Sequence, residues 1–423
     1  MSDGGSEDGA GSYISRIGRI SHNAVLYLIF VLLTTFHVGV YDVIFNLYIL
    51  RLGFGEVFLG LLLSISSASI GLFSIPSGSV CDRLGQKRTL VISYAILSIS
   101  LLLLYSSTSR ETLAFASILR GAALSLSLVV GAAFLVENST RYERVHLFSL
   151  YYAVHTLSML SGNLIGGLMP GLLSDLLSLE PRGAWVYRLA LYASLAAVTV
   201  SLLPLSCIRE AGCLGVRRSG SPSAFRSLAQ ERNARRMVLV YCLIGLGWGT
   251  SLPYFNVYFD TVLGAGTDQI GLIFSSSQLI MAAGYLMVPL LTARLGRIRM
   301  ASSVQALSIP FLMVFVSASN IPVAALGYAM RYMLMNMANP VLNSFKLEIV
   351  SSGQRAAMNS ITWTACYTFV GIGTYAGGVM MAEGRSTMPF LITGGIYALT
   401  AVLYYIYFNG LEEGQRANKA DRD

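Results

Sequence analysis

Residues 120–167 read RGAALSLSLVVGAAFLVENSTRYERVHLFSLYYAVHTLSMLSGNLIGG, and much of this segment returns later in the chain. Residues 331–378 repeat it 211 positions further on, without an insertion. The shared positions are Arg120 and Arg331, Phe134 and Phe345, Glu137 and Glu348, Arg144 and Arg355, Ser149 and Ser360, and Gly162, Gly166 and Gly167 with Gly373, Gly377 and Gly378. Because the repeat keeps charged residues within largely apolar sequence, it indicates an internal duplication of a membrane unit.

The composition agrees with a membrane protein, since 54% of the 423 residues are hydrophobic and only 12% are charged. Apolar segments of about 20 residues, each able to cross a hydrocarbon core of about 30 Å as a helix, occur twelve times. We therefore predict an all-α membrane protein of twelve transmembrane helices in two pseudo-symmetric bundles of six. The predicted spans are residues 25–50, 57–81, 90–107, 112–136, 145–168 and 184–206, then 237–259, 269–292, 300–318, 321–345, 356–381 and 389–408.

Basic residues predict the orientation, because positively charged loops stay on the cytoplasmic side. With both termini inside, 22 of the 29 Lys and Arg fall on cytoplasmic segments, five outside and two within helices. We expect a multi-pass protein of the cell membrane with a disordered tail 1–24, a bundle 25–206, a linker 207–236, a bundle 237–408 and a tail 409–423. The linker carries seven basic residues, which are expected against anionic lipid headgroups rather than nucleic acid.

The loop after the second span has a distinctive spacing of Gly, three residues, Asp-Arg, one residue, Gly and then basic residues. It reads Gly78-Ser-Val-Cys-Asp82-Arg83-Leu84-Gly85-Gln86-Lys87-Arg88. The loop resembles the signature loop of the major facilitator superfamily, and its spacing returns as Ala293-Arg294-Leu295-Gly296-Arg297-Ile298-Arg299. The resemblance covers nearly the whole chain and implies a secondary transporter that works by alternating access between two bundles.

The resemblance also implies a gate at the cytoplasmic helix ends. Asp82 is expected to cap the second-half helix that opens near Ala356, since a helix N-terminus favours negative charge. Glu137 and Glu348 are expected to pair with the basic residues of the signature loops, at about 0.2–1 kcal/mol for each exposed pair. The predicted gate residues are Gly78, Asp82, Arg83, Gly85, Lys87, Arg88, Glu137, Arg144, Arg294, Gly296, Glu348 and Arg355. Positive-inside anchoring is the other explanation for Arg83, Lys87 and Arg88.

Ionisable residues away from both membrane surfaces are the candidates for solute contact, because burying charge in a membrane is costly. Arg120 lies about 14 Å deep, at 1.5 Å per residue from the start of its span, and Arg331 reaches a similar depth. Asp42 is the only acidic residue inside a predicted span. Drug/proton antiporters of the superfamily use an acid in span one and an Arg in span four, so the resemblance suggests that Asp42 and Arg120 form a coupling pair. Solvation of Asp42 and bonding of each Arg to helix carbonyls are the alternatives.

Four further residues complete the candidate site. Asn46-Leu-Tyr48 matches Asn256-Val-Tyr258 across the repeat, which predicts that both asparagines are structural or general cavity residues. His37 and His155 fall near mid-depth, where either could carry a proton. A hydrogen-bonded packing role is the alternative for each histidine.

Two transport hypotheses follow. The first is proton-coupled movement of a small amphipathic solute, with drug-like efflux as one plausible form and the direction left open. The second is uptake or exchange of a small organic or inorganic anion held by the two arginines. The sequence contains no catalytic constellation, metal-ligand spacing or phosphate-binding loop, so we predict no enzyme, no metal and no cofactor. The expected partners are the solute, a proton or other coupling ion and the lipid bilayer, and a monomer is expected.

Overall fold

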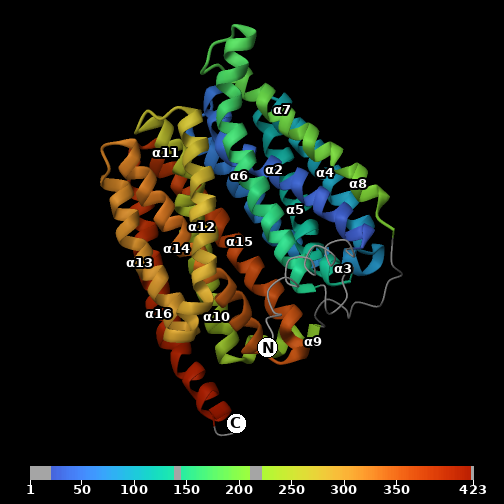
Figure 1. Cartoon of the computed structure of the whole chain (residues 1–423), viewed down its shortest axis with the longest axis vertical. Coiled ribbons are helices and arrows are strands. Elements are labelled where there is room, and N and C mark those ends of the chain that lie inside the picture. The colour runs from blue at the N-terminus through green and yellow to red at the C-terminus, as the bar shows by residue number, and fades with distance from the viewer. Residues whose placement is uncertain (1–20, 138–143, 210–221, 421–423) are drawn as a thin grey trace, which may run out of the picture.

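The chain folds into long helices that run between two ends of the molecule (Figure 1). The structure is a computed structural model that describes residues 21–137, 144–209 and 222–420, and these residues form helices and no strands. The predicted all-α fold class is therefore confirmed. Apolar residues cover most positions of these helices, as expected for helices that face lipid on one side and other helices on the other.

The first half contains six membrane-length segments. Each predicted span matches one helix, except that the sixth is divided at Ser201 into two helices. The helices are α2 (His22–Arg51), α3 (Glu56–Leu84), α4 (Gln86–Ser106), α5 (Arg110–Glu137), α6 (Arg144–Leu177), α7 (Ala184–Val200) and α8 (Leu202–Cys207).

The second half repeats this arrangement after a short helix, α9 (Pro222–Gln230). Its first span is broken, because Pro253 has no N–H to continue the helical hydrogen bonds. The elements are α10 (Arg232–Ser251), the 3-10 turn η1 (Leu252–Tyr254), α11 (Phe255–Thr261), α12 (Thr267–Leu295), α13 (Arg297–Ser317), α14 (Ile321–Glu348), the 3-10 turn η2 (Ser352–Gln354), α15 (Arg355–Ala382) and α16 (Met388–Ala420).

Twelve spans are supported by helix length. Eleven segments of the described residues are long and apolar enough to cross a membrane, and α14, with 28 residues, has the length but a more polar sequence. Two helices are longer than predicted, since α6 continues to Leu177 and α16 to Ala420. Apolar sequence ends where a helix leaves the hydrocarbon core, whereas the helix itself can continue into water.

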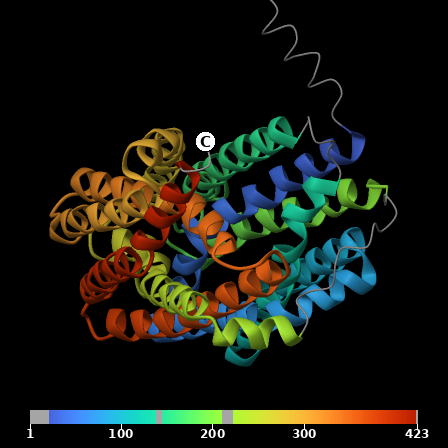
Figure 2. The same ribbon diagram turned by 90° about the horizontal axis from the view of Figure 1, so that it is seen from below.

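The two halves lie side by side (Figure 2) and meet mainly through two helix pairs, α3 with α15 and α6 with α12, with further contacts of α2 with α11 and α12. Glycines allow the close approach. A Cβ atom added to Gly167 would lie 2.7 Å from the Cα of Gly271, and one added to Gly378 would lie 3.0 Å from the Cα of Gly60. Small residues at such crossings let helix backbones pack closely in a membrane.

The two ends of the molecule differ. An even number of spans returns the chain to the end where it began, so α2 begins and α16 ends on the same side, at the bottom of Figure 1. We call this the terminal side and the opposite end the far side. The glycine contacts Gly60–Gly378 and Gly167–Gly271 lie in the far-side parts of their helices.

Candidate transport site

An ion pair joins the two halves on the far side. Arg51 ends α2, and its Nη2 donates to both carboxylate oxygens of Asp260 in α11 at 2.8 Å. The Asp260 side chain is 6% exposed and that of Arg51 25% exposed. A charge-assisted bond of this kind, partly removed from water, is a strong link between the two halves.

Asn46 and Asn256 form a second link, one to two helical turns deeper. Asn46 Nδ2 donates to Asn256 Oδ1 at 3.1 Å and to the carbonyl of Pro253, while Asn256 Nδ2 donates to the carbonyls of Asp42 and Val43 at 3.0 Å. The amide of Asn46 thereby donates to a carbonyl at the break in the span, where regular helical hydrogen bonding is interrupted. Both side chains are buried and neither lines a cavity described below, so direct solute contact by these predicted residues stays a prediction.

A cavity of about 350 Å³ opens between the second half and α2. We call it the Asp42–Arg331 cavity. Asp42 is its one lining residue from the first half, and its side chain is exposed there. The remaining walls come from α10, α14, α15 and α16, together with Leu252. The lining residues are Asp42, Tyr241, Ile244, Trp248, Leu252, Arg331, Tyr332, Met335, Asn336, Asn339, Leu342, Asn343, Trp363, Cys366 and Tyr397.

Arg331 is the cation of this cavity. It is 4% exposed, and its guanidinium lies 5.3 Å from the ring centre of Phe255 and 5.6 Å from that of Tyr397. Its Nε atom is buried and has no hydrogen-bond partner within the described residues. Burying a charge in a membrane without a carboxylate partner is energetically costly. Such a residue is therefore a candidate for a functional role.

Three asparagines form a polar stripe on α14 that the sequence analysis missed. Asn336, Asn339 and Asn343 all line the cavity, and Asn339 Nδ2 donates to Asn336 Oδ1 at 3.2 Å. The Tyr241 hydroxyl donates to Asn343 Oδ1 at 3.1 Å. Their spacing of three and four residues within an apolar span was the available signal, because such spacing places side chains on one helix face.

Lys346 is a second buried cation that the sequence analysis missed. It is 1% exposed, and its Nζ atom lies 4.9 Å from the ring centres of both Tyr241 and Trp363. Nζ has no hydrogen-bond partner in the described part of the chain. Since both rings line the Asp42–Arg331 cavity, Lys346 lies directly behind its wall.

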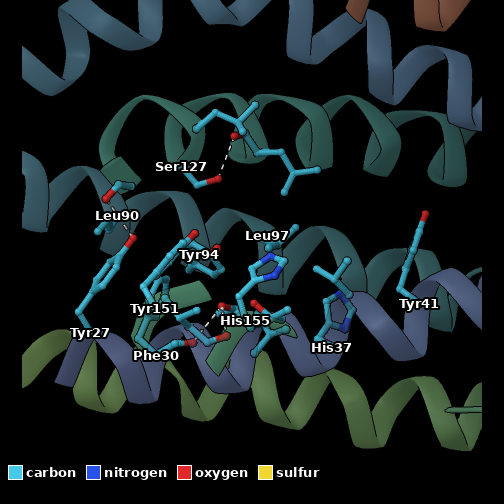
Figure 3. A pocket seen from close by; sticks show the side chains of 18 of the residues that line it. Tyr27, Phe30, His37, Tyr41, Leu90, Tyr94, Leu97, Ser127, Tyr151 and His155 are labelled. Atoms are coloured by element: carbon cyan, nitrogen blue, oxygen red, sulfur yellow. Dashed lines mark hydrogen bonds between the residues drawn. The ribbon is translucent and has the colours of Figure 1, made fainter. Parts of the chain in front are cut away.

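The first half encloses a separate cavity of about 370 Å³, shown in Figure 3, which we call the Arg120 cavity. Arg120 Nη1 donates to Ser66 Oγ at 3.0 Å, and the guanidinium stacks on Tyr41 with 4.3 Å to the ring centre. His37 and His155 also line it. The lining residues are Tyr27, Phe30, Val31, Thr34, Thr35, His37, Val38, Tyr41, Leu90, Tyr94, Leu97, Arg120, Leu124, Ser127, Leu128, Gly131, Tyr151, His155 and Val198.

The structure therefore places the predicted coupling pair in different cavities. Asp42 lines one cavity with Arg331, Arg120 lines the other, and no hydrogen bond or ion pair joins Asp42 to Arg120 among residues 21–137. The buried His37 contacts Ser194, with 3.1 Å between Nδ1 and Oγ, which supports the packing alternative for this histidine. His155 is exposed within the Arg120 cavity. Proton transfer by either histidine stays a prediction.

The two signature loops have the predicted turn glycines. Gly85 has φ = 82° and Gly296 has φ = 89°, a left-handed conformation that favours glycine. Arg83 lies in the last turn of α3, Lys87 and Arg88 in the first turn of α4, and Gly78 is buried within α3. The expected cap of Asp82 on α15 stays a prediction.

The second signature loop is held by acidic residues. Arg297 Nη1 contacts Glu348 Oε2 at 2.6 Å, so the predicted pairing of Glu348 with this loop is confirmed as a contact. Glu412 of α16 accepts hydrogen bonds from the N–H groups of Arg297 and Ile298 at 2.8 and 2.9 Å. Arg294 is exposed, and Arg355 Nε donates to the carbonyl of Leu347 at 3.1 Å. The side chains of Glu137 and Arg144 lie outside the described residues.

Two six-helix halves around a cavity with opposed charges define a membrane transporter of the two-bundle class. The family model of the Major Facilitator Superfamily matches residues 18–233 and 237–423. The chain therefore belongs to the major facilitator superfamily of secondary transporters, as the signature loop predicted.

Solved structures of transporters share the fold. The nucleoside transporter NupG aligns with a TM-score of 0.74 at 15% identity, covering 91% of this chain and 100% of that one. A D-xylose-proton symporter aligns with a TM-score of 0.71 at 16% identity, covering 93% and 98%. A bacterial homologue of the human lysosomal transporter Spinster, in an inward-facing and occupied conformation, aligns with a TM-score of 0.73 at 13% identity, covering 94% and 97%. No curated protein gave a significant match to the sequence.

Proposed function

We propose that the protein carries a small, polar, ring-bearing solute through the Asp42–Arg331 cavity, with Asp42 as the group that takes up and releases a proton. One observation carries the proposal, namely that Asp42 and Arg331 come from different halves and line the same cavity. The two halves move relative to each other during alternating access. With one group on each half, this movement changes the distance between Asp42 and Arg331 and therefore the affinity of the cavity for the solute and of Asp42 for the proton.

The walls of the cavity favour a polar solute over a lipophilic cation. A cavity for a lipophilic cation needs an acid among aromatic rings, but here Arg331 adds a positive charge to the same cavity. Trp248, Trp363 and Tyr332 offer flat surfaces for a ring, and the asparagine stripe offers donors and acceptors for hydroxyl or amide groups. NupG and the D-xylose-proton symporter are named for solutes of this general kind, although their likeness to this chain concerns the fold.

The arrangement of the halves corresponds to an inward-facing state under the predicted orientation. The hydrogen bonds that join the halves within the described residues lie on the far side or near the middle of the helices, as for Arg51, Asn46 and Ser275. The cavity wall on α14 continues toward the terminal side as far as Asn343. A solute would then enter or leave from the cytoplasm in this state.

The proposal is tested in liposomes that contain the purified protein and a pH-sensitive dye. We expect nucleosides or pentoses to trigger proton movement in the wild type, and Asp42→Asn to abolish proton movement while solute exchange continues. Asp175→Asn is the matched control, because Asp175 is an exposed acid at the far-side end of α6. Unchanged proton coupling in Asp42→Asn would contradict the proposed role of Asp42.

Exchange of a small anion is the second candidate. Its specific support is that Arg331 and Lys346, both buried and without hydrogen-bond partners on Nε and Nζ in the described residues, lie at or behind one cavity wall. In the same liposomes, anion exchange lost in Arg331→Gln and kept in Asp42→Asn would support this candidate. Solute-triggered proton movement lost in Asp42→Asn would instead support the first.

A further inference from the structure

The Arg120 cavity has no role in the proposed transport path, and its lining differs in charge from that of the Asp42–Arg331 cavity. Its lining residues include one arginine and two histidines but no carboxylate. The Asp42–Arg331 cavity, in contrast, contains a carboxylate beside its arginine. A cleft with basic groups and no acid selects against cations and favours an anion.

The same cavity is rich in aromatic surface. Tyr27, Phe30, Tyr41, Tyr94 and Tyr151 line it, and Figure 3 shows the rings of Tyr94, Tyr151 and His155 arranged between Tyr27 at one end and Tyr41 at the other. Rings of this kind bind a flat aromatic molecule by stacked or edge contacts. The volume of about 370 Å³ lies in the range of known small-molecule sites, roughly 300–1,000 Å³.

Arg120 is positioned to hold the charged group of such a molecule. Stacking on Tyr41 and the hydrogen bond to Ser66 fix the guanidinium in place. A guanidinium has five N–H donors, and the described residues use one of them in a hydrogen bond. A carboxylate can therefore accept the remaining donors without displacing a protein group.

We propose that the Arg120 cavity is a second binding site, for an aromatic carboxylate whose ring lies among the tyrosines and whose carboxylate contacts Arg120. The site is distinct from the transport site, because adjacent residues of α2 face different cavities: Tyr41 lines the Arg120 cavity and Asp42 lines the other. The inference does not depend on which solute is transported.

The test uses the full-length protein in detergent and equilibrium dialysis with radiolabelled 2-naphthoate. We expect saturable binding that Arg120→Gln weakens by about tenfold or more, since hydrogen bonds to charged groups are the stronger ones. Arg182→Gln is the matched control, because Arg182 is an exposed arginine that lines neither cavity, and Arg331→Gln reports any binding in the other cavity. Neutral 2-naphthalenemethanol is expected to bind more weakly than naphthoate by a similar factor.

A second variant covers the case in which Arg120→Gln does not fold. His155→Trp adds volume at an exposed position of the cavity and leaves Arg120 unchanged, and it is expected to block naphthoate binding. Equal binding in His155→Trp and the wild type would overturn the proposal. So would loss of binding in Arg331→Gln alone, or equal affinity for the neutral alcohol.

Discussion

At the scale of single residues, the ionisable groups in or beside the spans fall into two kinds. Arg51 forms an ion pair with Asp260, whereas Arg331 and Lys346 form no ion pair within the described residues and carry buried nitrogen atoms without hydrogen-bond partners there. A charge near the centre of a membrane costs about 2.5–3.5 kcal/mol on insertion scales. Buried charged groups that no ion pair compensates are therefore candidates for solute contact.

Lys346 gives a stability prediction. Lys346→Met keeps the length of the side chain and removes a buried charge that has no hydrogen-bond partner in the described residues, so we expect the free energy of unfolding to rise by about 1 kcal/mol after the lost cation–π contacts are subtracted. Thermal unfolding in detergent measures the change. Lys87→Met, at the half-buried start of α4, is the control and should unfold at nearly the wild-type temperature. A clearly lower unfolding temperature for Lys346→Met would mean that the ammonium group makes a favourable contact.

The sequence predicted some residues of the site and could not predict their grouping. The repeat placed Arg120 and Arg331 at similar depth, and both line cavities. Which cavity Asp42 shares depends on the rotation of α2 and on its contacts with α10 and α11, which local sequence does not encode. Lys346 escaped notice because it lies near a predicted helix end, where a lysine normally extends into water.

At the scale of helices, close crossings decide how the halves meet. The twelve spans could be predicted because each is a long apolar segment. The break at Pro253 is visible in the sequence only as a proline within a span, and its consequence depends on Asn46 reaching it from the other half. A partner that comes from 207 residues away cannot be inferred from local pattern.

The crossing of α6 and α12 gives a second prediction. A Cβ atom on Gly167 would lie 2.5 Å from the carbonyl oxygen of Thr267, so Gly167→Ala should prevent full closure of the far side. We expect the initial transport rate to fall several-fold, since a steric clash at such a crossing costs about 1–3 kcal/mol. Gly171→Ala, one turn along the same helix, is the control because a Cβ there meets no atom within 4 Å. Equal rates in both variants would contradict this explanation.

At the scale of the whole molecule, the alternating access that we propose requires that the contacts of the far side break in each cycle. These contacts include the Arg51–Asp260 ion pair and the Asn46–Asn256 bond, which join the same two helical segments, α2 and α11. Their loss must be offset by new contacts on the terminal side, where the predicted gate residues lie.

A population measurement tests this view. Asp260→Asn removes a partly buried charge pair worth about 1–3 kcal/mol, so we expect the outward-open population to increase by about tenfold. Spin labels at Thr108→Cys and Glu383→Cys, both exposed on the far side in different halves, report the separation in a cysteine-free background. Asp175→Asn should leave the distance distribution unchanged. An identical distribution in Asp260→Asn and the wild type would show that the ion pair does not hold the far side closed.

The bond between Glu412 and the start of α13 also bears on how the protein is made. The N–H groups of Arg297 and Ile298 find their acceptor in α16, 115 and 114 residues further along the chain, and Arg299 pairs with Glu413 of the same helix at 2.5 Å. Synthesis proceeds from the N-terminus at about 5–20 residues per second. The N–H groups that begin α13 are therefore made several seconds before their acceptor, and a chain that stops before residue 412 would keep the Arg297–Glu348 contact but lack the hydrogen bonds to Glu412.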